Sequence, residues 1–592
     1  MKPGHLLLLC LTGVACAPPG SARLPEVVPT PVALNPPSLL PDYLAAEPDV
    51  DSIVASLSLH AKVAQLIMPW LAGSYAAFDS DAFAQAKEWV EVHKVGGIIV
   101  SVGSPLDVAA KLNELQHNSD LPLLIAADLE WGAGMRLVGG TAFPMPMALG
   151  ATGRELDAYE VGRVTAIEAR AVGIHMTFSP VADLNNNPDN PIINTRSFGE
   201  DPDAVATLIA AYVRGAEEHG LFTTAKHFPG HGDTGIDSHI SIPATAACWE
   251  RLNDVELVPF RRAIEAGVTA VMTAHISVPC LHAQQSIPAT LSRTLMTDVL
   301  RDSLGFDGLV ITDALIMGAI INEYGANEAV LRAFEAGSDL LLMPADVGAA
   351  IGAMVDAIES GRLDEGRLDT SVRRVIELKI AAGLFTRRRV SLDELPRVVG
   401  SAQFQQLADD IAARALTLVQ QGPLDSFRAD SARMALITYA EETNLTVGNT
   451  LLGQLRATGY AVRPFRLYPS SGAASYDSAR TVAVEEDVVV FASSVRPIAW
   501  LGHVALPDSL AALILEADSM KPTLLASFGS PYLLNQLHGF GGTLLLAWSD
   551  NLATERAVAA AISGTIPIGG RSPIQINDDM RRGHGVTIDA VR

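Results

Sequence analysis

Short apolar segments alternate with amphipathic helical patterns through residues 50–385, and this alternation restricts the fold more than any other feature of the sequence. Each segment has the length of a buried strand. Eight strands separated by helices predict a (β/α)₈ barrel, with an open doubly wound sheet as the alternative. The eight segments are 66–68, 97–100, 121–126, 175–178, 221–224, 270–274, 308–312 and 339–343.

Charged and imidazole side chains follow several of these segments, and their placement favours the barrel. Barrel enzymes build their active sites at the carboxyl ends of the strands, from residues of many different strands. An open sheet would gather its polar residues at one crevice instead. The residues in question are Asp128, Asp183, Lys226, His227, His275 and Asp313.

A second α/β unit follows a charged, proline-containing linker at residues 386–410. Residues 411–592 contain further apolar segments with helical patterns between them, which predict a smaller α/β sandwich domain with a mainly parallel sheet. The predicted strands are 434–438, 487–491, 523–526 and 543–547.

The net charge of the 592-residue chain is −24, which argues against nucleic acid or anionic lipid as its main partner. Cys248 and Cys280 could pair in an oxidising compartment, but so few cysteines give no disulfide framework. We therefore expect both to be buried free thiols.

The N-terminus has the pattern of an export signal. Residues 1–17 hold a lysine, an apolar run and small residues, and Gly13-Val-Ala-Cys16 is similar to a lipoprotein box in which Cys16 is lipidated. Ala15-Cys-Ala17 offers a competing secretory cleavage site, but Pro18 disfavours it. The proline-rich residues 18–49 would form a tether. We expect an exported lipoprotein at the periplasmic or outer cell surface, and otherwise a secreted protein.

The segment from Lys226 to His239, Lys-His-Phe-Pro-Gly-His-Gly-Asp-Thr-Gly-Ile-Asp-Ser-His, concentrates proton carriers on an irregular loop. The spacing of His227 and His231 would suit a metal only on a continuous helix, which Pro229 and Gly230 interrupt. We predict acid and base chemistry there, with no metal and no cofactor.

Roles can be assigned within this group. Asp313 directly after a strand suits a nucleophilic carboxylate, although Asp in that position is also a common helix N-cap. Asp237 can orient His239 as a general acid, because histidine titrates near neutral pH. Lys226 and His227 can donate hydrogen bonds to substrate hydroxyl groups, and Lys226 can also neutralise a buried aspartate.

The same loop resembles the signature of family 3 glycoside hydrolases, in the β-N-acetylglucosaminidase branch. The resemblance covers about residues 50–385 and extends more weakly to Ser527-Phe-Gly-Ser-Pro-Tyr532. The supporting motifs, in the order of the family, are Phe143-Pro-Met-Pro-Met-Ala-Leu-Gly150, Ser179-Pro-Val-Ala-Asp183, Arg196-Ser-Phe-Gly-Glu-Asp-Pro202 and Ile311-Thr-Asp-Ala-Leu-Ile-Met317.

This resemblance implies a retaining exo-β-N-acetylglucosaminidase, with peptidoglycan fragments as first substrates and chitin oligosaccharides as second. It implies that Asp313 forms a glycosyl-enzyme intermediate and that His239, oriented by Asp237, is the acid/base. Most retaining glycosidases use two carboxyl groups instead, and a histidine leaves phosphorolysis open. The implied sugar-binding residues are Asp128, Arg136, Arg196, Lys226 and His227.

One motif departs from the family pattern. Asp128-Leu-Glu-Trp-Gly-Ala133 has Trp131 where glycine is common and Ala133 where arginine is common, so the leaving-group preference is open. Two roles are open for Trp131: its ring stacks on a sugar, or it only fills space in the loop. The alternatives to the predicted activity are a family 3 β-glucosidase, which the Asp237 and His239 pair disfavours, and an inactive sugar-binding surface lipoprotein.

Overall fold

The computed structural model describes residues 49–77, 79–236, 238, 241–282, 285–429, 432–497 and 504–591. Its first domain is a barrel whose strands lie close to the predicted segments. The barrel strands are β1 (Ile67–Met68), β2 (Trp70–Leu71), β3 (Gly97–Val100), β4 (Leu124–Ala127), β5 (Met176–Thr177), β6 (Thr224–Phe228), β7 (Ala270–Thr273), β8 (Leu309–Ile311) and β9 (Leu341–Leu342).

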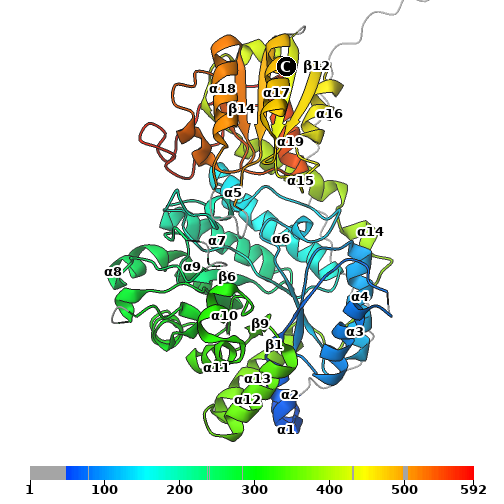
Figure 1. Ribbon diagram of the computed structural model, residues 1–592. Coiled ribbons are helices and arrows are strands. Elements are labelled where there is room, and N and C mark those ends of the chain that lie inside the picture. Colours follow the sequence, from blue (N-terminus) through cyan, green and yellow to red (C-terminus); the bar gives the residue numbers. More distant parts are fainter. Residues whose placement is uncertain are drawn as a thin grey trace, which may run out of the picture. The chain divides into compact units, whose positions relative to one another are not determined.

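All strand pairs of this barrel are parallel. β2, β3, β4 and β5 form one run and β6, β7 and β8 another. Single parallel bridges continue the ring beside these strands: Met176 of β5 pairs with Phe222 just before β6, and Ile311 of β8 pairs with Leu340 just before β9, which itself pairs with β1. β1 and β2 are two pieces of one strand on either side of Pro69, so the ring has eight strand positions. The predicted (β/α)₈ barrel is confirmed (Figure 1).

The helices of the barrel surround the strands and bury their apolar sides against them (Figure 1). Helix α7 illustrates the local cause: Asp201 caps its first turn, Pro202 suits the first helical position, and ten of its sixteen residues are buried. The helices are α1 (Val50–Ser56), α2 (Leu59–Ala64), α3 (Asp81–Lys87), η1 (Glu88–Val92), α4 (Pro105–Asn118), η2 (Ala133–Met135), α5 (Pro146–Thr152), α6 (Glu155–Ala171), η3 (Asn194–Arg196), α7 (Pro202–Glu217), α8 (Trp249–Arg251), η4 (Leu252–Glu256), α9 (Val258–Glu265), η5 (Pro279–Leu281), η6 (Ala289–Leu291), η7 (Thr294–Ser303), α10 (Gly318–Tyr324), α11 (Ala326–Ala336), α12 (Val347–Glu359) and α13 (Glu365–Ala381).

Strand β6 lies further along the chain than its apolar segment predicts. The backbone of Lys226 pairs with Pro180 and Ala182 of the loop after β5, which keeps the chain extended through Phe228. Lys226 and His227 therefore lie within the strand rather than after it.

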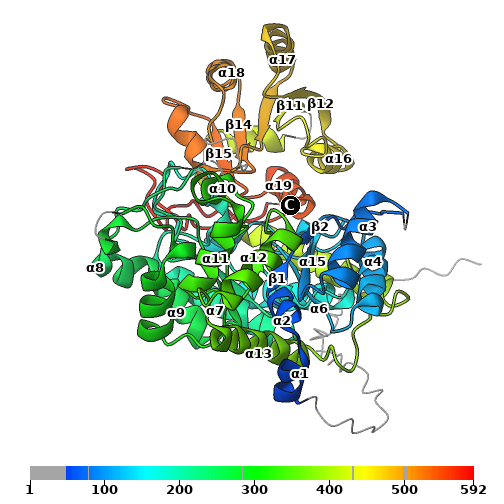
Figure 2. The same ribbon diagram turned by 60° about the horizontal axis from the view of Figure 1, so that its bottom comes forward.

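The second domain contains a six-stranded sheet in the order β10-β15-β14-β13-β11-β12, parallel except for β10 (Figure 2). Helices α17 and α18 cover one face, and α16 and α19 the other. The predicted sandwich with a mainly parallel sheet is confirmed. The elements are β10 (Thr417–Gln420), η8 (Leu424–Arg428), β11 (Arg433–Tyr439), α16 (Asn449–Ala457), β12 (Ala461–Leu467), α17 (Ala473–Glu485), β13 (Val488–Ser493), α18 (Asp508–Met520), β14 (Thr523–Ser527), η9 (Pro531–Gln536), β15 (Thr543–Leu546) and α19 (Leu552–Ser563).

The linker range 386–410 contains α14 (Leu395–Val398) and most of α15 (Ala402–Ala415). Side chains of the second domain also bind barrel loops. Asn185 donates to the hydroxyl of Tyr532 at 2.7 Å, and Asn194 donates to Ser530 at 3.2 Å. Tyr532 and Ser530 belong to the motif that extends the family resemblance, so that motif contacts the loops around the barrel mouth.

The structure corrects the expectation for the cysteines. Cys248 and Cys280 form a disulfide, with their Cα atoms 5.3 Å apart. Cys248 lies just before α8 and Cys280 lies in η5, so the fold brings together two residues that are 32 positions apart in the sequence.

Cys16 and the predicted leader and tether, apart from Asp49, lie outside the described residues. Within the described ranges, no helix combines the length and apolar character needed to cross a bilayer.

Candidate active site

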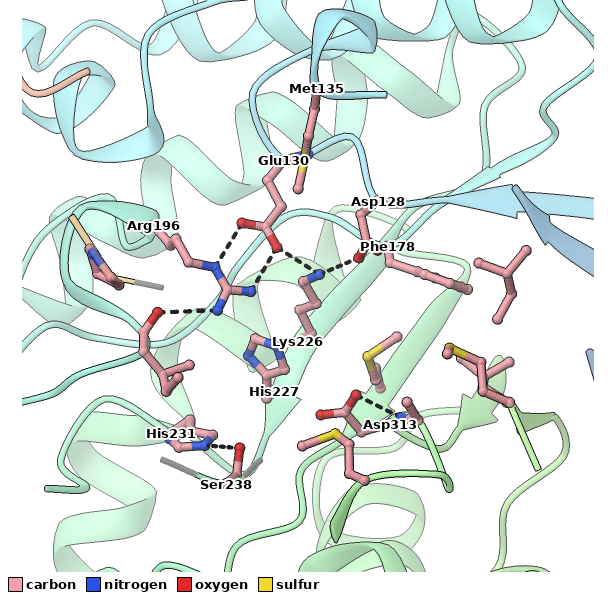
Figure 3. A pocket seen from close by; sticks show the side chains of 18 of the residues that line it. Asp128, Glu130, Met135, Phe178, Arg196, Lys226, His227, His231, Ser238 and Asp313 are labelled. Atoms are coloured by element: carbon pink, nitrogen blue, oxygen red, sulfur yellow. Dashed lines mark hydrogen bonds and ion pairs between the residues drawn. The ribbon is translucent and has the colours of Figure 1, made fainter. Parts of the chain in front are cut away.

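A cavity of about 690 Å³ lies at the carboxyl ends of the barrel strands. The residues predicted to bind sugar and the predicted nucleophile all line it, although they come from loops and strands far apart in the sequence (Figure 3). These residues are Asp128, Arg136, Arg196, Lys226, His227 and Asp313.

Lys226 occupies the centre of an ion-pair network on one wall of the cavity. Its Nζ atom donates to Asp128 Oδ1 at 2.9 Å and lies 2.8 Å from Glu130 Oε1. Arg136 donates to the other oxygen of Asp128 at 3.0 Å. Arg196 binds Glu130 with two hydrogen bonds of 2.7 and 2.9 Å (Figure 3). The network fixes several charged donors and acceptors on the surface that a polyhydroxylated ligand would contact.

Glu130 is the member of this network that the sequence reasoning missed. Its side chain is only 2% exposed, and it accepts from both Arg196 and Lys226. The signal available in the sequence is its position two residues after Asp128, because alternate residues of an extended segment point to the same side. That spacing predicts that the side chains of Glu130 and Asp128 lie on the same side of the segment.

The two carboxyl groups of the network stay ionised. Burial by itself would raise the pKa of Glu130, but the charges of Arg196 and Lys226 outweigh burial and hold the pKa well below its ordinary value. Burial opposes ionisation of Asp128 in the same way, and Lys226 and Arg136 lower its pKa. Burial also opposes the charge on Lys226, but the two carboxylates raise its pKa. The network therefore remains charged at neutral pH.

Asp183 is fully buried beneath the cavity and organises the histidine segment. Its Oδ2 atom lies 2.6 Å from His227 Nδ1, and its Oδ1 atom accepts from the backbone N–H of His231 at 2.6 Å. Burial raises the pKa of Asp183, whereas His227 lowers it, and the lowering prevails. Because Asp183 is ionised, Nδ1 of His227 carries a proton, and Nε2 is the ring nitrogen left for a ligand.

His231 stabilises the loop rather than contributing a charge. Its Nδ1 atom is 2.7 Å from the Thr234 hydroxyl, and its Nε2 atom is 3.0 Å from the Ser238 hydroxyl. Burial lowers the pKa of His231 to about 4, so the ring is neutral at neutral pH. Ser238 lies between Asp237 and His239, which are themselves outside the described residues.

Asp313 follows β8 by two residues and faces the cavity opposite the ion-pair network (Figure 3). Its backbone N–H donates to Thr273 of β7 at 3.1 Å, and its Oδ1 atom accepts from the N–H of Ala314 at 2.7 Å. The next helix, α10, begins only at Gly318 with Met317 as its N-cap. Asp313 therefore does not serve as the N-cap of that helix.

His275, which also follows a strand, supports this loop from behind. Its Nε2 atom donates to the carbonyl oxygen of Ala314 at 3.0 Å, and Nδ1 lies 2.8 Å from the Thr290 hydroxyl. His275 is not among the residues that line the cavity, so its contacts fix the backbone beside Asp313.

The open part of the cavity has an apolar lining and receives residues from both domains. Trp70, Trp131 and Ile316 line it, and the side chain of Trp131 is thus placed at the cavity wall. Arg496 and Pro497 of the second domain also line it, and Arg496 lies 3.6 Å from Asp550. These two residues follow β13 and carried no signal in the sequence analysis.

Among the residues that the structure covers, no group of three or more histidine, cysteine, aspartate or glutamate side chains is arranged to hold a metal ion. The cavity therefore offers charged and hydrogen-bonding side chains, one carboxylate on the facing wall, and an apolar rim. This combination suits the binding of a sugar and attack on it by a carboxylate.

The sequence matches known proteins across both domains. Residues 58–378 match the family description Glycosyl hydrolase family 3 N terminal domain. A protein of Cellulomonas fimi named beta-N-acetylglucosaminidase/beta-glucosidase is 31% identical over 505 residues, which are 81% of this chain and 88% of that relative. Beta-hexosaminidase LpqI of Mycobacterium tuberculosis is 34% identical over 384 residues, which are 62% of this chain and 94% of that relative.

Solved structures agree with these matches. The family 3 beta-N-acetylglucosaminidase from Paenibacillus sp. str. FPU-7 superimposes with a TM-score of 0.80 at 34% identity, covering 88% of this chain and 99% of that chain. Beta-glucoside phosphorylase BglX superimposes with a TM-score of 0.81 at 26% identity, covering 89% and 96%. By the family match and these relatives, the chain belongs to glycosyl hydrolase family 3 and is a hydrolytic glycosidase.

Proposed function

We propose that this protein is a retaining exo-β-N-acetylglucosaminidase that releases terminal β-linked N-acetylglucosamine. The observation that supports this proposal most directly is the shared cavity of Asp313 and the ion-pair network around Lys226. The names of the relatives from Cellulomonas fimi and Mycobacterium tuberculosis point to the same activity. In this proposal Asp128, Arg136, Arg196, Lys226 and His227 bind the terminal sugar.

The proposed reaction has two steps. Asp313 attacks the anomeric carbon while His239 donates a proton to the glycosidic oxygen, so the bond to the leaving group breaks and a glycosyl ester forms. Neutral His239 then takes a proton from water, which attacks the same carbon and releases Asp313. Asp237 orients the imidazole during both transfers. The hydrogen bond between His231 Nε2 and the Ser238 hydroxyl supports this assignment, because it restrains Ser238, which lies between Asp237 and His239 in the sequence.

Peptidoglycan fragments are our first choice of substrate and chitin oligosaccharides our second. Phosphorolysis is a specific alternative, because one structural neighbour is named a beta-glucoside phosphorylase. A histidine acid/base becomes neutral after it gives up its proton, so it does not repel a phosphate anion as a carboxylate would. Glucosidase activity is a further alternative, since the relative from Cellulomonas fimi carries both names.

Hydrolysis of a chromogenic N-acetylglucosaminide tests the proposal. We expect turnover by the wild type, and a loss of about 10³-fold or more in kcat for Asp313→Ala, because no other group would form the ester intermediate. Proton NMR of the first product should show the β-anomer. Undiminished turnover by Asp313→Ala, or an α-anomer as the first product, would contradict the proposal. N-acetylglucosamine 1-phosphate as the main product in phosphate buffer would favour phosphorolysis.

Matched substrates distinguish the remaining alternatives. Comparing the chromogenic N-acetylglucosaminide with the corresponding glucoside separates an acetylglucosaminidase from a β-glucosidase. A wild-type protein that binds N-acetylglucosamine but turns over neither compound would be the inactive sugar-binding lipoprotein. Comparing N-acetylglucosaminyl-anhydromuramic acid with chitobiose then ranks the natural substrates.

We also propose that the protein is exported and lipidated at Cys16. The disulfide between Cys248 and Cys280 supports export, because disulfides persist in oxidising compartments. Labelling of the expressing cells with a fatty acid should modify the wild type but not Cys16→Ala. Equal labelling of both proteins, or none of either in a lipidating host, would contradict lipidation at this residue.

A further inference from the structure

A second cavity, of about 700 Å³, lies at the opposite end of the barrel from the candidate active site. Its position follows from strand β8: Asp313 comes after the strand, whereas the cavity adjoins residues just before β8 and β9. Helices η7 and α11 and the start of α13 supply its walls, and α11 and α13 lie in the lower part of Figure 1. The arginines that line it are Arg293, Arg301, Arg362, Arg367 and Arg374.

Three of these arginines share one buried carboxylate. Arg301 donates to Asp339 Oδ2 at 2.8 Å, while Arg367 and Arg374 lie 3.2 and 3.1 Å from Oδ1. The Ser371 hydroxyl and the backbone N–H of Val310 donate to the same carboxylate at 2.6 and 3.0 Å. Asp339 is fully buried, and these five donors use its acceptor capacity. Its single negative charge balances only one of the three arginine charges.

The other acidic residues nearby do not remove this excess. Glu335 and Glu328 pair with Arg362 at the outer edge of the cavity. Asp364 also lines the cavity and caps α13 at the N–H of Arg367, and it contributes one negative charge. Asp307, which is exposed, raises the pKa of Arg301 less than Asp339 does. The cavity lining therefore holds five arginines but only two carboxylates, Glu335 and Asp364, and with Asp339 beneath it the arginines still outnumber the carboxylates, in a protein whose net charge is −24.

Uncompensated charge in a partly buried site has a free-energy cost, which a bound counter-ion would relieve. Burial lowers the pKa of Arg301 and of Arg367, and repulsion from Arg374 adds to this although Asp339 acts in the opposite direction. Only one guanidinium nitrogen of Arg374 has a hydrogen bond to Asp339, and its side chain is 29% exposed. Planar guanidinium groups in such an arrangement match the oxygens of a phosphate group.

We propose that this cavity binds a small phosphate-bearing anion, held by the guanidinium groups of Arg367 and Arg374 with Arg293 at the entrance. Its concave shape favours a soluble anion over the surface of a bilayer. The site is separate from the sugar-binding cavity, and the inference does not depend on the proposed substrate.

Isothermal titration of the whole protein with pyrophosphate and with orthophosphate, in metal-free buffer, tests the inference. We expect saturable binding to the wild type and at least a tenfold weaker affinity in Arg374→Gln. Arg480→Gln is the matched control, because Arg480 forms surface ion pairs in the second domain, and it should bind like the wild type. Equal affinities of wild type and Arg374→Gln, or heats that sodium chloride of equal ionic strength reproduces, would overturn the inference.

Two further measurements secure the interpretation. Arg374→Gln should keep the wild-type rate on a chromogenic glycoside, which shows that it is folded. If Arg374→Gln does not fold, Arg293→Gln replaces it as the test variant, because Arg293 is exposed. We expect this variant to bind pyrophosphate severalfold more weakly than the wild type. Binding to phosphatidylglycerol vesicles without affinity for free pyrophosphate would indicate a membrane surface instead, and would refute the soluble anion.

Discussion

Replacing Glu130 by glutamine tests whether the buried carboxylate positions the cations of the candidate active site. Glu130 Oε2 accepts from Arg196 Nε at 2.9 Å, and Oε1 is within 2.8 Å of both Arg196 Nη2 and Lys226 Nζ. Glutamine keeps the size but has an NH₂ group, which would face an N–H donor on one side. The substitution therefore removes the charge and, in the more favourable amide orientation, sets the NH₂ group against Arg196 Nε.

The magnitude follows from the burial of the group. Breaking a buried ion pair by changing one partner costs about 3–5 kcal/mol. Lys226 keeps Asp128, and Arg196 keeps the carbonyl of Ile192, so we expect the lower end of that range. If about 3 kcal/mol is lost from the positioning of substrate-binding cations, kcat/KM falls by about 100-fold, since 1.36 kcal/mol corresponds to a factor of ten.

The assay measures kcat/KM with a chromogenic substrate together with the thermal unfolding midpoint. Glu217→Gln is the matched control, because Glu217 is a largely buried carboxylate bound by Thr223 and Thr269 without a cation, and an amide oxygen can replace it. We expect Glu217→Gln to keep its kcat/KM. A Glu130→Gln enzyme with wild-type kcat/KM would refute the reasoning, as would an equal loss in the control.

Three further predictions concern stability. Burial lowers the pKa of His231 in the folded protein to about 4, below its ordinary value of 6.5. The stabilisation from the neutral ring is therefore complete above pH 6.5, and up to about 3 kcal/mol of the free energy of unfolding is lost as the pH falls from 6.5 through 4. Urea unfolding midpoints should show this loss for the wild type and a smaller loss for His231→Gln. Reducing the disulfide between Cys248 and Cys280 should cost about 2–4 kcal/mol, measured as a lower midpoint with dithiothreitol, and Cys280→Ser should make the midpoint insensitive to the reductant. Burial lowers the pKa of Lys379 to about 7 in the folded protein, so protonation of this group opposes folding below pH 10.5. Lys379→Met should therefore raise the unfolding temperature more at pH 6 than at pH 10. A larger gain at pH 10 would contradict this.

The barrel was predictable because its strands are buried on both sides. Such strands are continuous apolar runs, and each of the eight predicted segments contains or adjoins an observed strand. The central strands of the second domain were found for the same reason. The edges of that sheet were not: β12 reads Ala-Val-Arg-Pro-Phe-Arg-Leu, with arginines and a proline that suit an edge strand but hide it in a sequence pattern.

The site was predictable where chemistry accompanied a strand end. Asp128, Lys226, His227 and Asp313 were found in this way, and the structure places all four at one cavity. Glu130 was missed because its importance comes from Arg196, which is 66 residues away and meets it only in the folded chain.

Tertiary contacts between distant segments were not predictable for the same reason. The disulfide was expected to be two thiols because sequence spacing does not report the distance between Cys248 and Cys280. Arg496 reaches the cavity from another domain, and nothing in its own neighbourhood indicates that. A local pattern identifies a side chain that acts beside its own strand, but not one that acts through a partner elsewhere.

Arg496 and Pro497 belong to the second domain, so the lining of the cavity is divided between the two domains. In the proposed reaction the barrel supplies the nucleophile and the sugar contacts, and among the described residues the second domain adds Arg496 and Pro497 to the cavity lining. The relative from Mycobacterium tuberculosis aligns over 94% of its own length with 62% of this chain, which leaves it little sequence for such a domain. If the barrel carries out the reaction as proposed, exchange of the second domain would change the cavity lining at Arg496 and Pro497 without changing Asp313, so selectivity would vary separately from chemistry.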